Sequence, residues 1–452
     1  MNTKVLAASV AAVVLGGLGA ASLAGGSTRS AAAPPATPWA ATECGTYSGT
    51  GCSPAEKRVD LDRPKFSNPT AITNPLFPIA DLRSAVLLGK VDGEQFRSET
   101  TLLPETVTVD WAGQRIEVLV SQYTAYRDGR IEEVAIDRYA QSDDGAVWYL
   151  GEDVVDYRDG VIFTTAGTWL AGREGPAAMI MPAHPMVGDV FRPENILGVV
   201  FEEVRVTDVG KTVPGTGGPI QGAVVAEELH LDGTHSEKVF APGRGEYSTG
   251  TGGDTEILAI GMPADAATGP EPAQLGDLLA ALLGYVGAAE GEDWEAATSI
   301  ATRIERLTRS LPRAGQPGLV LDRLDGDVRT LARLARSKDI AGSSTAAILA
   351  GQSVVDLQLR YRPAAVVDRA RFELWCYRVL VDAAAGDRAG VRGDVATLEW
   401  MRDRFAATLS DGDRAQLDAR IAALRGAAAE PGGSVGDHAI RLADFLRRVS
   451  PT

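Results

Sequence analysis

Two patterns of hydrophobic and polar positions divide the chain. Between Pro64 and Met262, polar and apolar residues alternate in short runs, for example from Arg115 to Val120 and from Val224 to Leu231. An alternation with a period of two places successive side chains on opposite faces of a β-strand. This part of the chain is therefore predicted to form β-strands.

Asp-Gly pairs interrupt these runs at regular intervals. Such pairs accommodate the positive φ angles that a tight hairpin turn requires. The pairs are Asp92-Gly93, Asp128-Gly129, Asp144-Gly145, Asp159-Gly160 and Asp232-Gly233. Successive strands are therefore expected to pair antiparallel, in a meander or a curved sheet.

The period changes beyond the strand-rich half. Leu275, Leu278, Leu279, Leu282 and Leu283 recur at spacings of three and four, which is the pattern of one face of an α-helix. Breaks in this pattern predict five or six helices in an up-and-down bundle. They fall at 310–318, 337–344, 362–363, 386–393 and 426–436.

A segment rich in proline and small residues separates the two patterns, and neither pattern continues through it. The sequence predicts an antiparallel β domain over 64–262, a linker over 263–273 and a helical bundle over 274–452. The expected fold class is α+β, with the sheet first and the helices second.

The N-terminus resembles an export signal. Lys4 precedes an uncharged run from Val5 to Leu23, and small residues follow, so 1–24 is interpreted as a signal peptide. A retained membrane anchor is the alternative, although the glycines and alanines of the run make it weakly apolar. Residues 25–63 are interpreted as a Pro/Ala-rich tether followed by a cysteine-containing loop, and the protein is expected to be secreted or extracytoplasmic.

Export to an oxidising compartment would allow the cysteines to form a disulfide. Cys44 and Cys52 flank a short polar loop, and a disulfide between them is expected. Zinc is the rival hypothesis, but neither His nor a third Cys lies nearby in the sequence. Cys376 lies in an apolar helical stretch and is expected to be a buried thiol.

The formal net charge of −16 is concentrated in the strand-rich half. Residues 64–262 contain 15 Lys and Arg against 30 Asp and Glu, a net charge of −15, whereas residues 271–452 contain 24 against 25, a net charge of −1. Because binding to nucleic acid requires a surplus of cations, nucleic acid is excluded as a partner. A requirement for solubility is sufficient to explain such a charge, and binding of a cationic ligand is the alternative explanation.

The search for catalytic and metal-binding motifs favours no activity. Glu227 and His230 have the E-x-x-H spacing, but residues three apart on a strand face opposite sides, so the match is interpreted as a coincidence. His230, Asp232 and His235 are interpreted as a solvated hairpin tip, and a metal site at this turn is the alternative. No catalytic residue, metal ligand or cofactor is predicted.

Aromatic, methionine and acidic residues concentrate between Val147 and Asp189. The favoured interpretation makes Trp148 and Trp169 ordinary core residues. A second combines Met179, Met181 and Met186 with His184 as soft ligands for Cu(I). A third, preferred over copper, is a concave apolar pocket, and its candidate ligand-binding residues are Trp148, Tyr149, Glu152, Trp169, Met181 and His184.

Three short segments carry a resemblance to a known group of proteins. The segments 74–78 (NPLFP), 148–153 (WYLGED) and 181–189 (MPAHPMVGD) resemble an uncharacterised family of exported bacterial β-domain proteins. The resemblance covers Asn74 to Ala259. It implies export and β structure, and it brings no activity or site residues with it.

The sequence thus favours an exported, non-catalytic binding or scaffolding protein that holds an unknown small or apolar ligand on its β domain. The helical half is expected to offer a surface for a protein partner. Two alternatives stay open. One is an extracytoplasmic copper-binding protein, and the other is a hydrolase whose carboxylates come from separate strands, because adjacent acids on one strand face opposite sides.

Overall fold

The computed structural model describes residues 44, 47, 49–430 and 433–449. The predicted signal peptide and the first part of the tether, up to residue 43, lie outside the described residues. No helix within these described ranges is both long enough and apolar enough to span a membrane.

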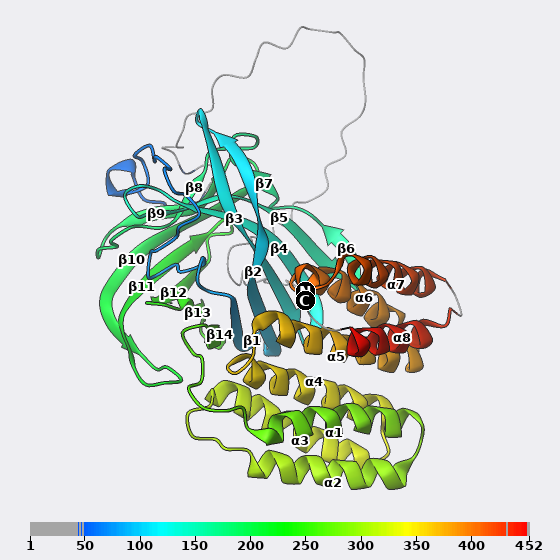
Figure 1. The fold of residues 1–452 in the computed structure, drawn as a ribbon. Helices are drawn as coiled ribbons and strands as arrows, with labels where there is room; N and C mark the ends of the chain where they lie inside the picture. Colours follow the sequence, from blue (N-terminus) through cyan, green and yellow to red (C-terminus); the bar gives the residue numbers. More distant parts are fainter. Residues whose placement is uncertain (1–43, 45–46, 48, 431–432, 450–452) are drawn as a thin grey trace, which may run out of the picture.

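The strand-rich half forms one sheet of fourteen antiparallel strands, as the sequence predicted (Figure 1). From one edge the strand order is β6-β5-β4-β3-β2-β1-β14-β13-β12-β11-β10-β9, and β7 and β8 both pair with β5. The strands are β1 (Ser84–Val91), β2 (Glu94–Trp111), β3 (Gln114–Arg127), β4 (Arg130–Gln141), β5 (Val147–Arg158), β6 (Val161–Thr164), β7 (Trp169–Leu170), β8 (Ala178–Met181), β9 (Val190–Ile196), β10 (Val200–Val213), β11 (Ile220–His230), β12 (His235–Ala241), β13 (Gly245–Thr251) and β14 (Asp254–Met262).

The predicted Asp-Gly turns explain much of this meander. At Asp92-Gly93, φ is 54° and 81°, so both residues adopt the left-handed conformation that a two-residue hairpin between β1 and β2 needs. Asp128-Gly129 and Asp159-Gly160 do the same for the β3–β4 and β5–β6 hairpins. The β2–β3 turn uses Ala112-Gly113 in this conformation, which the composition of the turn did not indicate.

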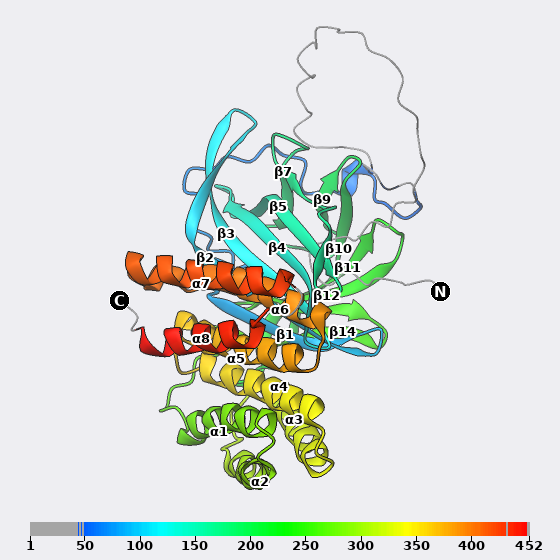
Figure 2. The same cartoon turned by 90° about the vertical axis from the view of Figure 1, so that its right-hand side faces the viewer.

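The helical half contains eight α-helices within the described residues (Figures 1 and 2). They are α1 (Ala273–Glu290), α2 (Trp294–Ser310), α3 (Gly318–Arg336), α4 (Ile340–Leu359), α5 (Ala364–Ala384), α6 (Arg388–Asp403), α7 (Asp411–Ala429) and α8 (Val435–Arg448). The expectation of five or six helices was wrong. Two further helices begin at capping residues that the predicted breaks did not include. Asp293 caps α2 and Ser410 caps α7, and each side chain accepts a hydrogen bond from a backbone N–H of the first turn.

The helices pack as two successive groups of four. Helix α1 packs against both α2 and α4, helix α5 packs against both α6 and α8, and α4 joins the groups by packing against α5. Figure 2 shows the two groups one above the other beside the sheet. The helical bundle that the sequence predicted is therefore confirmed, with more helices than expected.

The two faces of the sheet have different surroundings. Val86 and Leu88 of β1 share a hydrophobic cluster with α1 and α4, whereas Ala85 and Leu87 point to the opposite, concave side. On β2, Arg97 and Glu99 meet the helices while Ser98 faces the concave side. The alternation of the strands thus separates a helix-covered face from an interior face.

Buried ion pairs fasten the helices to the sheet. Asp356 of α4 accepts two hydrogen bonds from Arg97, at 2.6 and 2.8 Å, and a third from Arg371 of α5 at 2.8 Å. Arg404, which follows α6, contacts Glu99 and Gln122 of the sheet. Because every member of this network is buried, its charges depend on one another for compensation.

The last strand ends at Met262 and the first helix begins at Ala273, close to the predicted boundary. The residues between them contact both halves. Asp265 pairs with Arg244 at 2.7 Å, and its carbonyl accepts a hydrogen bond from Arg360 at the end of α4. The division into two domains stays a prediction.

Candidate functional site

A row of polar side chains crosses the concave face of the sheet. Glu202 of β10 lies directly opposite Glu194 of β9 and opposite His230 of β11 in the strand register. Directly opposed residues of antiparallel strands share a face, and so do residues two apart on one strand. Glu194, Glu202, Glu228 and His230 therefore project to the same side, and all four are buried.

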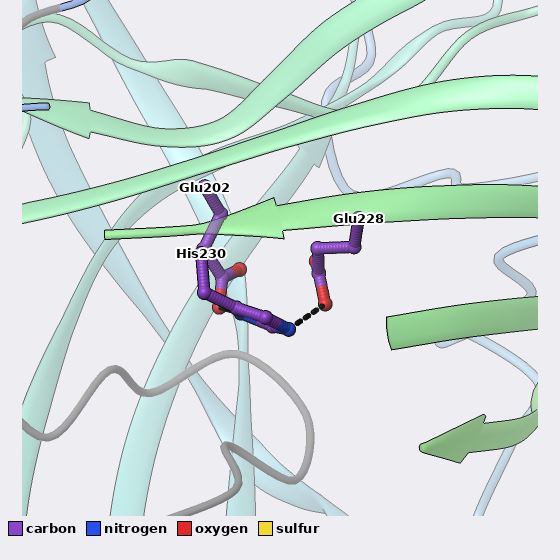
Figure 3. Close-up of side chains that lie close together, drawn as sticks. All are labelled: Glu202, Glu228 and His230. Carbon is purple, nitrogen blue, oxygen red and sulfur yellow. Dashed lines mark ion pairs between the residues drawn. The ribbon is translucent and has the colours of Figure 1, made fainter. Parts of the chain in front are cut away.

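Glu202, Glu228 and His230 form the tightest group in this row (Figure 3). The imidazole lies between the two carboxylates, with Nδ1 3.6 Å from Glu202 Oε1 and Nε2 3.6 Å from Glu228 Oε2. Ser236 of β12 lies beside them, 2.9 Å from His230 Nε2 and 3.4 Å from Glu228 Oε2. Side chains from three neighbouring strands thus meet at one point.

Lys238 supplies the nearest positive charge. Its Nζ lies 2.9 Å from Glu228 Oε1 and 3.6 Å from Glu246 Oε2, and only 3% of its side chain is exposed. Burial favours the neutral form of Lys238, but the charges of Glu228 and Glu246 outweigh burial and raise its pKa. Lys238 therefore stays charged and links the Glu228 group to Glu246.

The carboxyl groups of the row differ in their pKa values. Burial, together with the charge of Glu202, raises the pKa of Glu228 to about 7 and that of Glu194 well above its ordinary value. Burial also acts on Glu202, but His230 and the charge of Lys238 outweigh it and lower the pKa of Glu202. The row thus contains carboxyl groups whose pKa values are shifted in opposite directions.

A pocket with a cavity volume of about 80 Å³ lies on the same concave face. Its walls are mainly apolar, and they come from β1 to β4, from β13 and from the segment before β1. The lining side chains include Phe77, Ile79, Leu82, Ala85, Leu87, Ser98, Thr100, Tyr123, Ala135, Asp137, Tyr139, Arg244 and Glu246. Two carboxyl groups, those of Asp137 and Glu246, therefore face an otherwise largely apolar space.

Asp137 is held in place by hydrogen bonds. Its carboxylate accepts from Tyr149 Oη at 2.7 Å and from Ser121 Oγ at 3.3 Å, and Tyr149 Oη also lies 3.0 Å from Glu152. Burial raises the pKa of Asp137 to about 6, while the hydrogen bonds from Tyr149 and Ser121 limit the rise. Asp137 is therefore a fixed carboxylate at neutral pH.

The ligand-binding residues predicted from the sequence lie elsewhere. Trp148, Trp169 and Met181 are buried in a hydrophobic cluster, with Trp148 6.3 Å from Trp111 between ring centroids. His184 is exposed in the loop after β8. Tyr149 and Glu152 are buried and reach Asp137 through hydrogen bonds. None of these six described residues lines the pocket, so ligand contact at them stays a prediction.

The proposed copper ligands are separated by burial. Met179 and Met181 are packed into the hydrophobic cluster, whereas 65% of Met186 is exposed and His184 is exposed as well. Thioethers that fill a core are not free to converge on an ion with exposed groups. This arrangement gives the copper hypothesis no support.

The disulfide between Cys44 and Cys52 is present, as predicted. The buried guanidinium of Arg192 on β9 lies beside it, with Nη2 2.9 Å from Cys52 Sγ, and pairs with Glu203 at 3.0 Å. Arg192 thereby links Cys52 to the edge strand β9, which also carries Glu194. Cys376 is buried in the helical half, as expected.

The reasoning from sequence missed the Glu202, Glu228 and His230 group. His230 was interpreted as part of a solvated hairpin tip, and this was wrong for His230, which is buried with 7% exposed. The E-x-x-H spacing from Glu227 to His230 joins residues that face opposite sides of the strand. The informative spacing was Glu228-x-His230, because residues two apart on a strand share a face.

Comparison of the chain with protein-family models, with curated proteins and with solved structures gave no match.

Proposed function

We propose that this chain is an exported binding protein that holds a small molecule with an apolar body and a basic group in the concave pocket of its sheet. The observation that carries the proposal is the placement of Asp137 and Glu246 in a largely apolar pocket on the concave face of the sheet. The apolar walls would take up the body of the ligand. Asp137 would pair with its ammonium group.

The charges around the pocket favour a cationic ligand over an anionic one. Arg244 at the pocket is already paired with Asp265 at 2.7 Å, and Lys238 behind Glu246 is paired with Glu228. Asp137 accepts hydrogen bonds from the neutral groups Tyr149 and Ser121. An incoming ammonium group would therefore meet a carboxylate that is hydrogen-bonded by neutral groups, with Arg138 as a neighbouring charge.

The export part of the proposal rests on the sequence and on the disulfide. The disulfide between Cys44 and Cys52 is typical of a protein that folds in an oxidising compartment. The predicted signal peptide would deliver the chain there. A protein partner for the helical half stays a prediction of the sequence.

The binding proposal is tested by calorimetric titration with a matched set of ligands. Phenethylamine and phenethyl alcohol share an apolar body and differ in the charged group. We expect the amine to bind more tightly, Asp137→Asn to weaken amine binding at least tenfold, and the alcohol to be unaffected by that variant. Asp153→Asn is the control, because Asp153 is an exposed carboxylate on the neighbouring strand β5.

A second variant addresses the pocket itself. Ala135→Leu adds volume to the lining and should weaken both ligands, because both would occupy the same apolar space. Amine binding that is unchanged in both Asp137→Asn and Ala135→Leu would contradict the proposal.

One observation also favours a hydrolase as a second candidate function. Asp137 of β4 and Glu246 of β13 come from separate strands and line the same pocket. Glycosidases use a pair of carboxyl groups that flank the scissile bond, and burial raises the pKa of Asp137 to about 6. Turnover of aryl glycosides by the wild type, lost in Glu246→Gln, would favour this function over simple binding.

A further inference from the structure

We propose that Glu202, Glu228 and His230 form a binding site for a single divalent transition-metal ion of the zinc class. The site is separate from the ligand pocket, and the proposal does not depend on the proposed function. Each of the three residues offers one ligand atom, and these atoms all lie within 4.8 Å of one another (Figure 3). Imidazole nitrogen and carboxylate oxygen are the ligand types that Zn²⁺ accepts in proteins.

The distance between His230 and Glu202 favours a shared ion over a direct hydrogen bond. Nδ1 and Oε1 lie 3.6 Å apart, which is too long for a hydrogen bond between these atoms. Two ligand atoms about 2.1 Å from one ion, at a roughly tetrahedral angle, lie about 3.4 Å from each other. An ion between these two atoms would need only a small adjustment of the side chains.

Several potential metal-ligand atoms of this site lack hydrogen-bond partners among the described residues. Both carboxylate oxygens of Glu202 and Nδ1 of His230 are buried and accept or donate no hydrogen bond. The same holds for both oxygens of Glu194, which lies opposite Glu202 in the register. Because a buried polar group without a partner is unfavourable, a bound cation would satisfy several of these atoms at once.

The surroundings orient the imidazole for this role. Nε2 of His230 contacts Ser236 Oγ at 2.9 Å, and Ser236 Oγ donates in turn toward Glu228 Oε2 at 3.4 Å. Metal-bound histidines characteristically donate their second ring N–H to a fixed polar group. With Nε2 engaged by Ser236, Nδ1 is the nitrogen that faces Glu202 and the ion, and Glu228, which faces Nε2, would have to turn toward the ion to complete the set of ligands.

The charge balance of the interior also suits a cation. Glu152, Glu194, Glu202 and Glu228 are all completely buried. Lys238 is shared between Glu228 and Glu246, so it cannot neutralise the whole row. A divalent ion at Glu202 would add positive charge to this acidic row, with Glu194 within the same row as a further oxygen donor.

The experiment is a calorimetric titration of the tag-free, EDTA-treated full chain with ZnCl₂. We expect one tight site per chain, and a loss of affinity of at least a hundredfold in Glu202→Gln and in His230→Gln. Glu227→Gln is the matched control. Glu227 is the neighbour of Glu228 on β11, but it faces the other side and pairs with His235 at 3.3 Å, with 43% of its side chain exposed. Tight binding should survive in Glu227→Gln.

Two outcomes would overturn the proposal. One is the absence of tight Zn²⁺ binding by the wild type, and the other is binding that is lost in Glu227→Gln but kept in Glu202→Gln. If the buried-site variants do not fold, X-ray absorption of the Zn²⁺-loaded wild type decides. We expect a first shell of nitrogen and oxygen at about 2.0–2.2 Å with one imidazole, and a shell with sulfur or several imidazoles would refute the site.

Discussion

Lys238 Nζ lies 2.9 Å from Glu228 Oε1 in the interior of the sheet, where both side chains are almost completely buried. A buried ion pair of this kind adds little stability compared with an apolar pair, but the loss of one partner leaves an uncompensated charge. Lys238 is also the link between the Glu228 group and Glu246 at the pocket. Lys238 therefore connects the Glu228 group to the pocket residue Glu246 through ion pairs.

Replacement of this lysine should be strongly destabilising. We expect Lys238→Met to lower the free energy of unfolding by about 3–5 kcal/mol, because Glu228 and Glu246 lose their shared cation. Urea denaturation followed by circular dichroism measures the change. Lys90→Met is the control, since Lys90 is an exposed lysine on β1, and its effect should stay below about 0.5 kcal/mol. Equal effects of the two variants would contradict the role given to Lys238.

Glu256 should make the stability of the protein dependent on pH. Burial raises its pKa to about 8, and its carboxyl group accepts a hydrogen bond from Ser98 Oγ at 2.8 Å. The folded state therefore binds the proton more tightly than the unfolded state does. This contribution to stability is complete below the unfolded pKa of about 4.5 and is lost as the pH rises through about 8.

The variant Glu256→Gln removes that titration. We expect its melting temperature to fall less than that of the wild type between pH 6 and pH 9, with Glu237→Gln, an exposed position on β12, behaving as the wild type does. Thermal unfolding monitored at a series of pH values measures the difference. Parallel curves for Glu256→Gln and the wild type would rule out this origin of the pH dependence.

Binding of an amine in the pocket should follow the ionisation of Asp137. Its pKa of about 6 results from burial, limited by hydrogen bonds from Tyr149 and Ser121 and by the charge of Arg138. The affinity for phenethylamine should therefore rise as the pH increases from 5 to 7 and then level off. Titration at several pH values tests this, and phenethyl alcohol should show no comparable change. An amine affinity that falls over this range would exclude Asp137 as its partner.

The buried network between sheet and helices should matter far more than a similar network on the surface. Asp356→Asn weakens contacts to Arg97 and Arg371, and we expect a loss of about 3–5 kcal/mol. Asp418→Asn is the matched control, because exposed Asp418 accepts the same kind of paired hydrogen bonds from Arg402 at 2.7 and 2.9 Å. Its expected loss is at most about 1 kcal/mol. Urea denaturation compares the two, and similar losses would contradict the assignment.

The state of the cysteines can be counted directly. The chain has three cysteines, of which Cys44 and Cys52 form a disulfide and Cys376 is buried. Burial also raises the pKa of the Cys376 thiol well above its ordinary value, which further slows its reaction. Maleimide labelling should modify no cysteine in the native protein, one after denaturation, and three after denaturation and reduction. Three labelled cysteines without reduction would exclude the disulfide.

Local sequence patterns determined the elements of this protein and their order. Alternation over 64–262 and the Asp-Gly pairs determined the antiparallel strands, because the period of the side chains and the positive φ of a tight turn are local properties. The three-and-four spacing beyond Gln274 determined helices for the same reason. The Cys44–Cys52 disulfide could also be predicted, because the two cysteines are close in the sequence and only a small polar loop separates them.

The candidate sites were decided only by the tertiary structure. Glu194, Glu202 and His230 lie in one row because the register sets them opposite one another, and register depends on the pairing of distant segments. Trp148 and Trp169 became core residues because other segments cover them, which no local pattern records. Likewise, the carboxyl groups of Asp137 and Glu246 are 109 residues apart in the sequence and meet only where the curved sheet brings β4 and β13 around one pocket.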